Sequence, residues 1–384
     1  MIRVAKRSTS LFCLISGLFV LSACQREAEV FESPHPYTLN IPQNFPTELN
    51  IPADNPLTVE GVALGRYLFY DGRMSGRDQP DSLMSCGTCH LQSNSFECGI
   101  NHPVFKDGHP FGLTGIKTPH VMLPFINLVF NSNGYLWNGM IHPSNPNPER
   151  RTLEDIVYMG VIAPHELHGD SVRTVKMIQN IKGYPELFWK AFGTRVVTMK
   201  NIEKAIAQFI RTLISTNNKF DRYCRGEEQL TYQEYKGWII FEEEADCANC
   251  HGSILLTSNL FFNNGKQANF TGVNDDTRDR FHFTGIQADI GAYRAPTLRN
   301  IDLTGPYMHD GRFKTLDEVI DFYSEGVQLS PYISPQMQFA STGGIHLSAE
   351  SKAALKAFLL TLHDNDFISN PAFSRPYQFP DQIQ

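Results

Sequence analysis

The sequence predicts a mostly α-helical protein with long ordered loops, built in two halves. Apolar residues recur at helical spacing in NIEKAIAQFIRTLIST, which begins at Asn201, and in LSAESKAALKAFLLTL, which begins at Leu347. The segments between these runs are dense in Gly, Pro and Asn and show no sustained period-2 alternation, so a large sheet is not expected. One short motif occurs once in each half, as CGTCH from Cys86 and as CANCH from Cys247.

Residues 1–23 are predicted to be a secretory signal of the lipoprotein type. MIRVAKRSTS carries three cations and no anion, an apolar run follows, and LSAC ends the run at Cys24. The apolar run is shorter than the roughly 20 residues that span a bilayer. We therefore expect a periplasmic protein that is anchored to the cell envelope of a Gram-negative bacterium only through lipid on Cys24.

Residues 24–56 are predicted to be an extended tether between the lipid and the folded body. The segment is rich in proline and turn formers, as in ESPHPY, IPQNFP and IPADNP.

The rest of the chain is predicted to form two domains, over residues 57–217 and 218–384. Single cores stop growing near roughly 250–300 residues, and the mature chain would have 361. The helix from Asn201 would end the first domain, and a helix with Ser348 as its N-cap would close the second. The mature chain keeps 30 basic and 40 acidic residues, a net charge of −10, which argues against nucleic acid as a partner.

The two CxxCH motifs indicate two covalently bound c-type haems. Cysteines at this spacing can each add to a vinyl group of one porphyrin, while the following histidine ligates the iron. The attachment residues would be Cys86, Cys89 and His90 in the first half, and Cys247, Cys250 and His251 in the second. A dithiol redox pair would need a βαβ unit, and a four-cysteine zinc site would leave both histidines without a role.

Several longer stretches resemble the bacterial di-haem cytochrome c peroxidases, a family with a radical-forming branch that includes the enzyme that matures methylamine dehydrogenase. The stretches are LGRYLFYDGRMS, TPHVMLPFIN, YLWNG, RTLEDIV and YRAPTLRNIDLTGPYMHDGRFKTLDEVIDFY. They cover most of residues 60–365. The resemblance implies two cytochrome c-like haem domains, the first peroxidatic and the second transferring electrons.

The resemblance also implies roles for individual residues. His90 and His251 would ligate the first and second haem irons, and His109 falls at the position of a removable distal histidine on the first haem. Glu166 falls at the position of the distal glutamate, which would take a proton from bound peroxide and return it to the leaving oxygen. Trp137 falls at the position of a tryptophan between the haems; Trp189 and Trp238 have no such match.

The sixth ligand of the second haem departs from the typical peroxidase pattern. Counting from His309 to the end of TLDEVIDFY arrives at Tyr323, where peroxidases carry methionine and the radical-forming relatives carry tyrosine. An anionic oxygen ligand would favour higher oxidation states of the iron. Met337, in SPQMQ, is the alternative ligand.

Calcium is a further cofactor that the resemblance implies, bound by the carbonyls of Thr304 and Pro306 and by an asparagine. The asparagine position is Lys117, whose charge would repel calcium, and Asn127 is the alternative.

Beyond the signal and the lipid site, two cysteines lie outside the motifs, Cys98 and Cys224. In an oxidising compartment they could pair or stay free.

Three functions follow as expectations. The first is a peroxidase that reduces hydrogen peroxide to water with electrons from a small periplasmic cytochrome c or cupredoxin. The second is a peroxide-driven oxidase of a partner protein, working through a high-valent haem pair with Tyr323 as a ligand. The third is a tethered electron carrier, which would require His109, or another strong ligand, never to leave the first haem. The resemblance implies a homodimer as well.

Overall fold

The computed structural model describes residues 1, 30–106, 108–270 and 279–383. Apart from Met1, the predicted signal and Cys24 lie outside the described residues. The described chain is mostly helical, as the sequence predicts, and its strands are two short antiparallel ribbons. Within the described part of the chain, no helix combines the length and apolar character needed to cross a bilayer.

Thirteen α-helices are present among the described residues, several of them short. Their bounds are α1 Val59–Tyr70, α2 Cys86–Cys89, α3 Leu153–Ile162, α4 Ser171–Asn180, α5 Tyr184–Phe192, α6 Met199–Arg211, α7 Lys219–Cys224, α8 Tyr232–Ile239, α9 Ala248–His251, α10 Asp279–Thr284, α11 Leu316–Asp321, α12 Ala349–Leu360 and α13 Asn365–Ser369. Two π-helical turns follow α8 and α11 directly, η5 Ile240–Glu244 and η8 Phe322–Gly326. The ribbons pair β1 Phe105–Lys106 with β2 His109–Pro110, and β3 Phe261–Phe262 with β4 Tyr293–Arg294.

The two helices expected from periodicity are α6 and α12. The Thr198 side chain accepts a hydrogen bond from the backbone N–H of Asn201 and caps α6, and Ser348 caps α12 through the N–H of Ser351, as predicted. The helix α6 ends at Arg211, although its apolar pattern continues to the buried Leu213.

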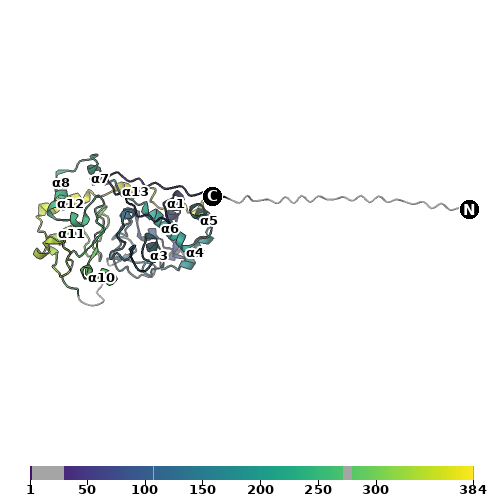
Figure 1. The fold of residues 1–384 in the computed structure, drawn as a ribbon, viewed down its shortest axis with the longest axis horizontal. Coiled ribbons are helices and arrows are strands. Elements are labelled where there is room, and N and C mark those ends of the chain that lie inside the picture. The colour runs from purple at the N-terminus through teal and green to yellow at the C-terminus, as the bar shows by residue number, and fades with distance from the viewer. Residues whose placement is uncertain (2–29, 107, 271–278, 384) are drawn as a thin grey trace. The chain divides into compact units, whose positions relative to one another are not determined.

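The same helix crossing is built twice. In the first half, α1 crosses α6 at Gly65, where an added Cβ would lie 1.9 Å from the carbonyl oxygen of Ala205. In the second half, α8 crosses α12 at Gly237, where an added Cβ would lie 1.9 Å from the carbonyl oxygen of Ala354. Each glycine therefore lets two helix backbones touch. Figure 1 shows the α1–α6 and α8–α12 pairs in separate parts of the folded body.

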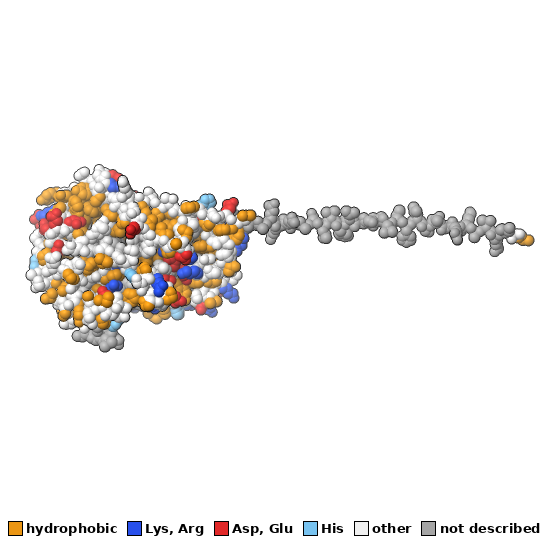
Figure 2. Space-filling view, viewed as in Figure 1, with side chains coloured by type: hydrophobic (Ala, Val, Ile, Leu, Met, Phe, Trp, Pro, Cys, Tyr) orange, Lys and Arg blue, Asp and Glu red, His pale blue; other side chains and the backbone are white. Residues whose placement is uncertain are grey.

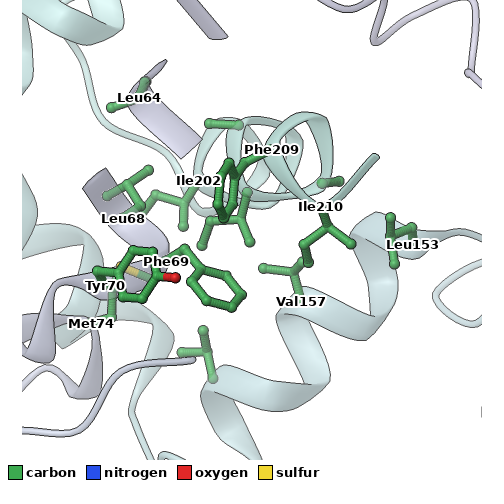
Figure 3. Close-up of a cluster of buried hydrophobic side chains, with 14 of the residues drawn as sticks. Leu64, Leu68, Phe69, Tyr70, Met74, Leu153, Val157, Ile202, Phe209 and Ile210 are labelled. Atoms are coloured by element: carbon green, nitrogen blue, oxygen red, sulfur yellow. The ribbon is translucent and has the colours of Figure 1, made fainter. Parts of the chain in front are cut away.

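Two large apolar clusters correspond to these pairs. In the first, side chains from α1, α3 and α6 meet, with Phe69 and Phe209 in edge contact at 5.3 Å between ring centroids (Figure 3). The second cluster surrounds Phe241 and Phe358, whose ring centroids are 5.2 Å apart. Each cluster lies beside one CxxCH motif, because Cys86 and Cys89 pack against the first and Cys247 against the second.

Much of the expected tether is bound to the body. Phe45 is 4% exposed and packs with Val129, Phe130 and Leu255, and Asn55 is buried against Glu154 and Gln208. Four further apolar side chains of this proline-rich segment pack against the same cluster, Leu39, Ile41, Leu49 and Ile51.

The C-terminal residues return to the first half. Phe367, Phe373 and Phe379 belong to the first cluster, and the Tyr70 hydroxyl donates to the carbonyl of Phe373 at 2.7 Å. A boundary drawn in chain order at residue 218 does not capture this return.

Candidate functional site

The first CxxCH motif opens onto a large cavity of about 550 Å³. The helix α2 consists of the motif itself, and the thiols of Cys86 and Cys89 and the ring of His90 line the cavity. The opposite walls come from the loop 118–128, from α3 and from the loop that carries Glu166. A volume of this size suits a cofactor rather than a solvent molecule.

The His90 ring is held in one orientation. Its Nδ1 lies 2.6 Å from the carbonyl oxygen of Phe96, and the ring stacks on Phe125 with centroids 3.8 Å apart. Burial lowers the pKa of His90 to about 4, which keeps the imidazole neutral. Since Nδ1 donates to the carbonyl, Nε2 carries the free lone pair that a metal requires.

The second motif repeats this arrangement at a cavity of about 200 Å³. Cys247, Cys250 and His251 line it, and Nδ1 of His251 lies 2.9 Å from the carbonyl oxygen of Pro296. Burial again lowers the histidine pKa to about 4.

The two donor sets fit two c-type haems. Each cavity offers a pair of thiols, an oriented neutral imidazole and mostly apolar walls. The four cysteines are divided between separate cavities, which does not match the alternative of one four-cysteine zinc site.

Glu166 lines the first cavity together with the motif residues. Its Oε1 lies 3.8 Å from Nε2 of His165, and the desolvation of the carboxyl group at the wall of this cavity raises its pKa to about 7. A carboxyl group with this pKa can both accept and donate a proton near neutrality. Gly160 on α3 leaves room for it, because a Cβ there would lie 2.9 Å from Glu166 Oε2.

His109 is not among the residues that line either cavity. It lies on β2, and the following residues Pro110 and Phe111 line the first cavity instead. Besides His90, the histidines that line the first cavity are His120, His165 and His282 of α10. Ligation by His109 stays a prediction, and it would require the β1–β2 ribbon to turn.

Trp137 borders both cavities. Its indole Nε1 donates to the carbonyl of Val121 at 2.8 Å, which fixes the ring, and only 9% of the residue is exposed. The role of Trp137 between two haems stays a prediction.

Tyr323 and Met337 both line the second cavity. Tyr323 lies on the π-helical turn η8, and its hydroxyl oxygen accepts a hydrogen bond from Nδ2 of Asn264 at 3.0 Å. Burial, with a smaller contribution from the two motif thiols, raises the pKa of Tyr323 above its ordinary value. π-Helical turns are frequent at functional sites.

Sequence reasoning missed a polar group beside Trp137. The ring of His309 stacks on Tyr293 with centroids 3.4 Å apart, and Lys266 Nζ lies 2.8 Å from His309 Nε2 and 2.8 Å from Asp310 Oδ2. Burial and the adjacent Lys266 lower the pKa of His309. In the sequence, the only sign of this group is the triplet HDG at His309. Its partner Lys266 lies 43 positions earlier in the chain, so no local pattern connects the two.

The structure gives little support for the calcium ligands that the resemblance implies. Both amide atoms of Asn127 bond the backbone of Ser215, at 3.1 Å and 2.9 Å, so this side chain is already engaged. Thr304 and Pro306 lie on the loop before His309.

Cys98 and Cys224 are both free thiols, the first buried and the second exposed.

Comparisons with known proteins agree with this architecture. A family model described as di-haem cytochrome c peroxidase matches residues 59–229. The methylamine utilization protein MauG of Methylorubrum extorquens is 32% identical over 83% of this chain and 82% of its own length. Cytochrome c551 peroxidase of Nitrosomonas europaea is 29% identical over 71% of this chain and 75% of its own length.

Solved structures agree as well. A MauG-like protein associated with microbial copper homeostasis superposes with a TM-score of 0.76, at 31% identity, over 89% of this chain and all of its own. The diheme peroxidase BthA of Burkholderia thailandensis has a TM-score of 0.63 over 84% of this chain and 91% of its own, at 16% identity, which supports the fold alone.

Proposed function

The chain belongs to the di-haem cytochrome c peroxidase family, and from that premise we propose that it reduces hydrogen peroxide to water with electrons from a small periplasmic redox protein. The observation that carries the proposal is Glu166. A carboxyl group with a pKa of about 7 lines the same cavity, of about 550 Å³, as the first CxxCH motif.

The chain's own residues supply proton handling and orientation. Glu166 takes the proton of a peroxide bound in the first cavity and returns it to the departing oxygen, while the Phe96 and Pro296 carbonyls hold His90 and His251 in place as ligands. The haems, when bound, supply O–O bond cleavage and storage of electrons. Trp137, buried between the cavities, conducts electrons from the second to the first.

Replacing Glu166 with glutamine tests the proton role. The Glu166→Gln protein keeps the size of the side chain and loses the base, so peroxide turnover should fall by about 10²-fold or more, as for other positioned acid–base groups. Haem content and the visible spectrum of the resting protein serve as controls. Unchanged turnover would remove Glu166 from the mechanism.

The second candidate function is a peroxide-driven oxidase of a partner protein. Tyr323 favours it, because the phenol lines the second cavity beside Asn264, and an anionic oxygen ligand stabilises higher oxidation states. Met337 lines the same cavity and supports the peroxidase with methionine as ligand.

The two ligands can be distinguished by paired variants. If tyrosine is the ligand, Tyr323→Phe changes the spectrum and raises the reduction potential of the second haem, while Met337→Leu changes neither. The reverse pattern would support methionine and the peroxidase.

We also propose a periplasmic location with lipid on Cys24. The predicted signal over residues 1–23, which ends in LSAC at Cys24, and the CxxCH motifs support export. When cells are fractionated, Cys24→Ser should release the protein into the soluble periplasmic fraction, and continued membrane association would contradict the lipid anchor.

The homodimer that the resemblance implies can be measured by light scattering of the soluble form. Calcium is not proposed as a cofactor, because both amide atoms of Asn127 bond the backbone of Ser215.

A further inference from the structure

A continuous series of aromatic rings connects the surface of α8 with the second cavity. Ring centroids are 5.6 Å apart for Tyr235 and Trp238, 5.6 Å for Trp238 and Phe220, 5.1 Å for Phe220 and Phe358, and 5.2 Å for Phe358 and Phe241. Phe241 lines the cavity that holds Cys247, Cys250 and His251. Each ring in the series is therefore in contact distance of the next.

The outer end of the series is open to solvent. Tyr235 is 44% exposed and its neighbour Tyr232 is 82% exposed, while Trp238 is partly buried.

Trp238 is chemically suited to carry an electron. Indole and phenol are the side-chain rings that lose an electron most readily, whereas the phenylalanine rings of the series only provide packed contact. The indole Nε1 of Trp238 donates to Oε1 of Glu242 at 3.4 Å, so a carboxylate is in place to attract the indole proton when the ring is oxidised. Tyr223 packs edge-on against the same indole at 5.7 Å.

The surface around this end is acidic. The segment 232–244 contains four acidic residues and one basic residue, a net charge of −3, and Glu243 and Glu244 are exposed. Two of these charges are paired across elements: Lys236 forms an ion pair with Glu350 at 2.7 Å, and Glu234 forms one with Lys219 of α7 at 2.7 Å. The acidic character of this end therefore rests on the exposed residues Glu242, Glu243 and Glu244. Figure 2 shows apolar side chains gathered over α7 and α8 at the left of the view, with acidic side chains beside them.

From these observations we propose that a small redox protein with a basic face docks on α8 and passes electrons through Tyr235 and Trp238 to the second haem. The inference rests on the proposed function and adds the route and the kind of partner. In each transfer the partner's cofactor is oxidised by one electron and the second haem is reduced by one. Two such electrons, with two protons from solvent, convert one hydrogen peroxide into two waters.

The first test measures electron entry after oxidation by peroxide, because a ferric haem is too weak an oxidant to take an electron from indole. One equivalent of hydrogen peroxide oxidises the haem-loaded protein, a reduced basic cytochrome c is then mixed in, and oxidation of the cytochrome is followed by stopped-flow absorbance. Trp238→Phe keeps a ring in contact with Phe220 and removes the indole, so the limiting rate constant should fall about tenfold or more, equal to a rise of about 1.4 kcal/mol in the barrier.

The matched control is Trp189→Phe. Trp189 is likewise a partly buried helical tryptophan, but it lies on α5 in the first half, under the guanidinium of Arg195 at 4.6 Å. This variant should react like the wild type. A Trp238→Phe rate within twofold of the wild type would overturn the route.

Two further measurements separate a route from general damage. The reduction potential of the second haem and its reduction rate with ascorbate, which needs no docking surface, should be unchanged in Trp238→Phe. After peroxide addition without donor, freeze-quenched electron paramagnetic resonance should show a signal that changes with deuterated tryptophan and of which a part is lost in Trp238→Phe. Because Trp137 is present in both proteins, a signal identical in the wild type and in Trp238→Phe would contradict the route.

Docking is tested by reversing charge. Glu243→Lys with Glu244→Lys should raise the cytochrome concentration needed for half-maximal rate several-fold and leave the limiting rate unchanged. A wild-type protein that the basic cytochrome fails to reduce, although ascorbate does, would overturn the basic partner.

Failure of the proposed function has a different signature. In that case the wild type does not turn over peroxide even with ascorbate as donor, while the oxidising equivalents from one equivalent of peroxide still oxidise the cytochrome faster in the wild type than in Trp238→Phe.

Discussion

At the scale of single residues, the pH dependence of the peroxide reaction is expected to follow Glu166. Burial raises the pKa of Glu166 to about 7, so below pH 7 the group is protonated and cannot act as a base. The bimolecular rate with peroxide should therefore rise as pH increases through about 7. Stopped-flow measurements of this rate between pH 5 and 9 check the prediction, because the range extends about two pH units to either side of the pKa.

The Glu166→Gln protein is the control for that profile. Its rate should be low and flat across the same range. A rising limb that persists in the variant would assign the ionisation to another group, such as the adjacent His165.

Gly160 offers a second prediction at this scale, because substitution there should affect activity and stability in opposite directions. An alanine Cβ would lie 2.9 Å from Glu166 Oε2, the movable end of a side chain, while alanine suits a helix better than glycine by roughly 0.5–1 kcal/mol. Gly160→Ala should lower the rate of the reaction with peroxide about tenfold, which is a fraction of the roughly 10²–10⁴-fold that a positioned acid–base group contributes. The same substitution should not lower the melting temperature.

A double substitution shows whether Gly160 acts through Glu166. In the Glu166→Gln background, Gly160→Ala should add little further loss, since the group it displaces no longer acts. Full additivity of the two effects would contradict the positioning role.

At the scale of elements, the paired glycines at the helix crossings should be intolerant of the same change. At Gly65 and Gly237 the nearest atoms are backbone carbonyl oxygens at 1.9 Å, so the helices must separate to admit a Cβ. Gly65→Ala and Gly237→Ala should each destabilise the protein by about 1–3 kcal/mol, the usual result of overpacking. Thermal unfolding of the haem-loaded protein measures the loss, with Gly160→Ala as the matched control. Equal stability of all three variants would contradict the crossing geometry.

These elements also show what the sequence could predict. Each CxxCH motif occupies five consecutive positions, so its two thiols and its imidazole must lie close together. The sequence therefore predicted these three residues as one group, and in each half they line the same cavity. The helices α6 and α12 followed from apolar spacing. Trp137 and Glu166 were placed by resemblance, and both line the cavities.

Other positions depended on loop geometry, which spacing does not encode. His109 was located by counting back from Thr118, but β1 and β2 form a ribbon that takes it off the cavity wall. Asn264 and Lys266 reach Tyr323 and His309 from residues about 40 to 60 positions away in the chain, so no local pattern announces them.

At the scale of the whole molecule, the C-terminal segment is expected to stabilise the first half rather than the second. Arg66 donates to the carbonyls of Ser374 and Pro371, at 2.7 Å and 2.8 Å, and Arg73 pairs with Asp381 at 2.8 Å. Since Phe373 is buried in the first cluster, Phe373→Ala should cost about 3–5 kcal/mol there.

Hydrogen exchange locates that loss. In Phe373→Ala, exchange should accelerate in peptides from α1 and in those containing Gln92, whose Nε2 donates to the carbonyls of Phe367 and Asn370, at 3.2 Å and 2.8 Å. Peptides from α8 and α12 should stay protected, because their apolar contacts belong to the second cluster. Faster exchange confined to α8 and α12 would mean that the segment stabilises the half that precedes it in the chain. Gln92 follows His90 by two residues. On heating Phe373→Ala, the native absorbance spectrum of the first haem should therefore be lost at a lower temperature than that of the second haem.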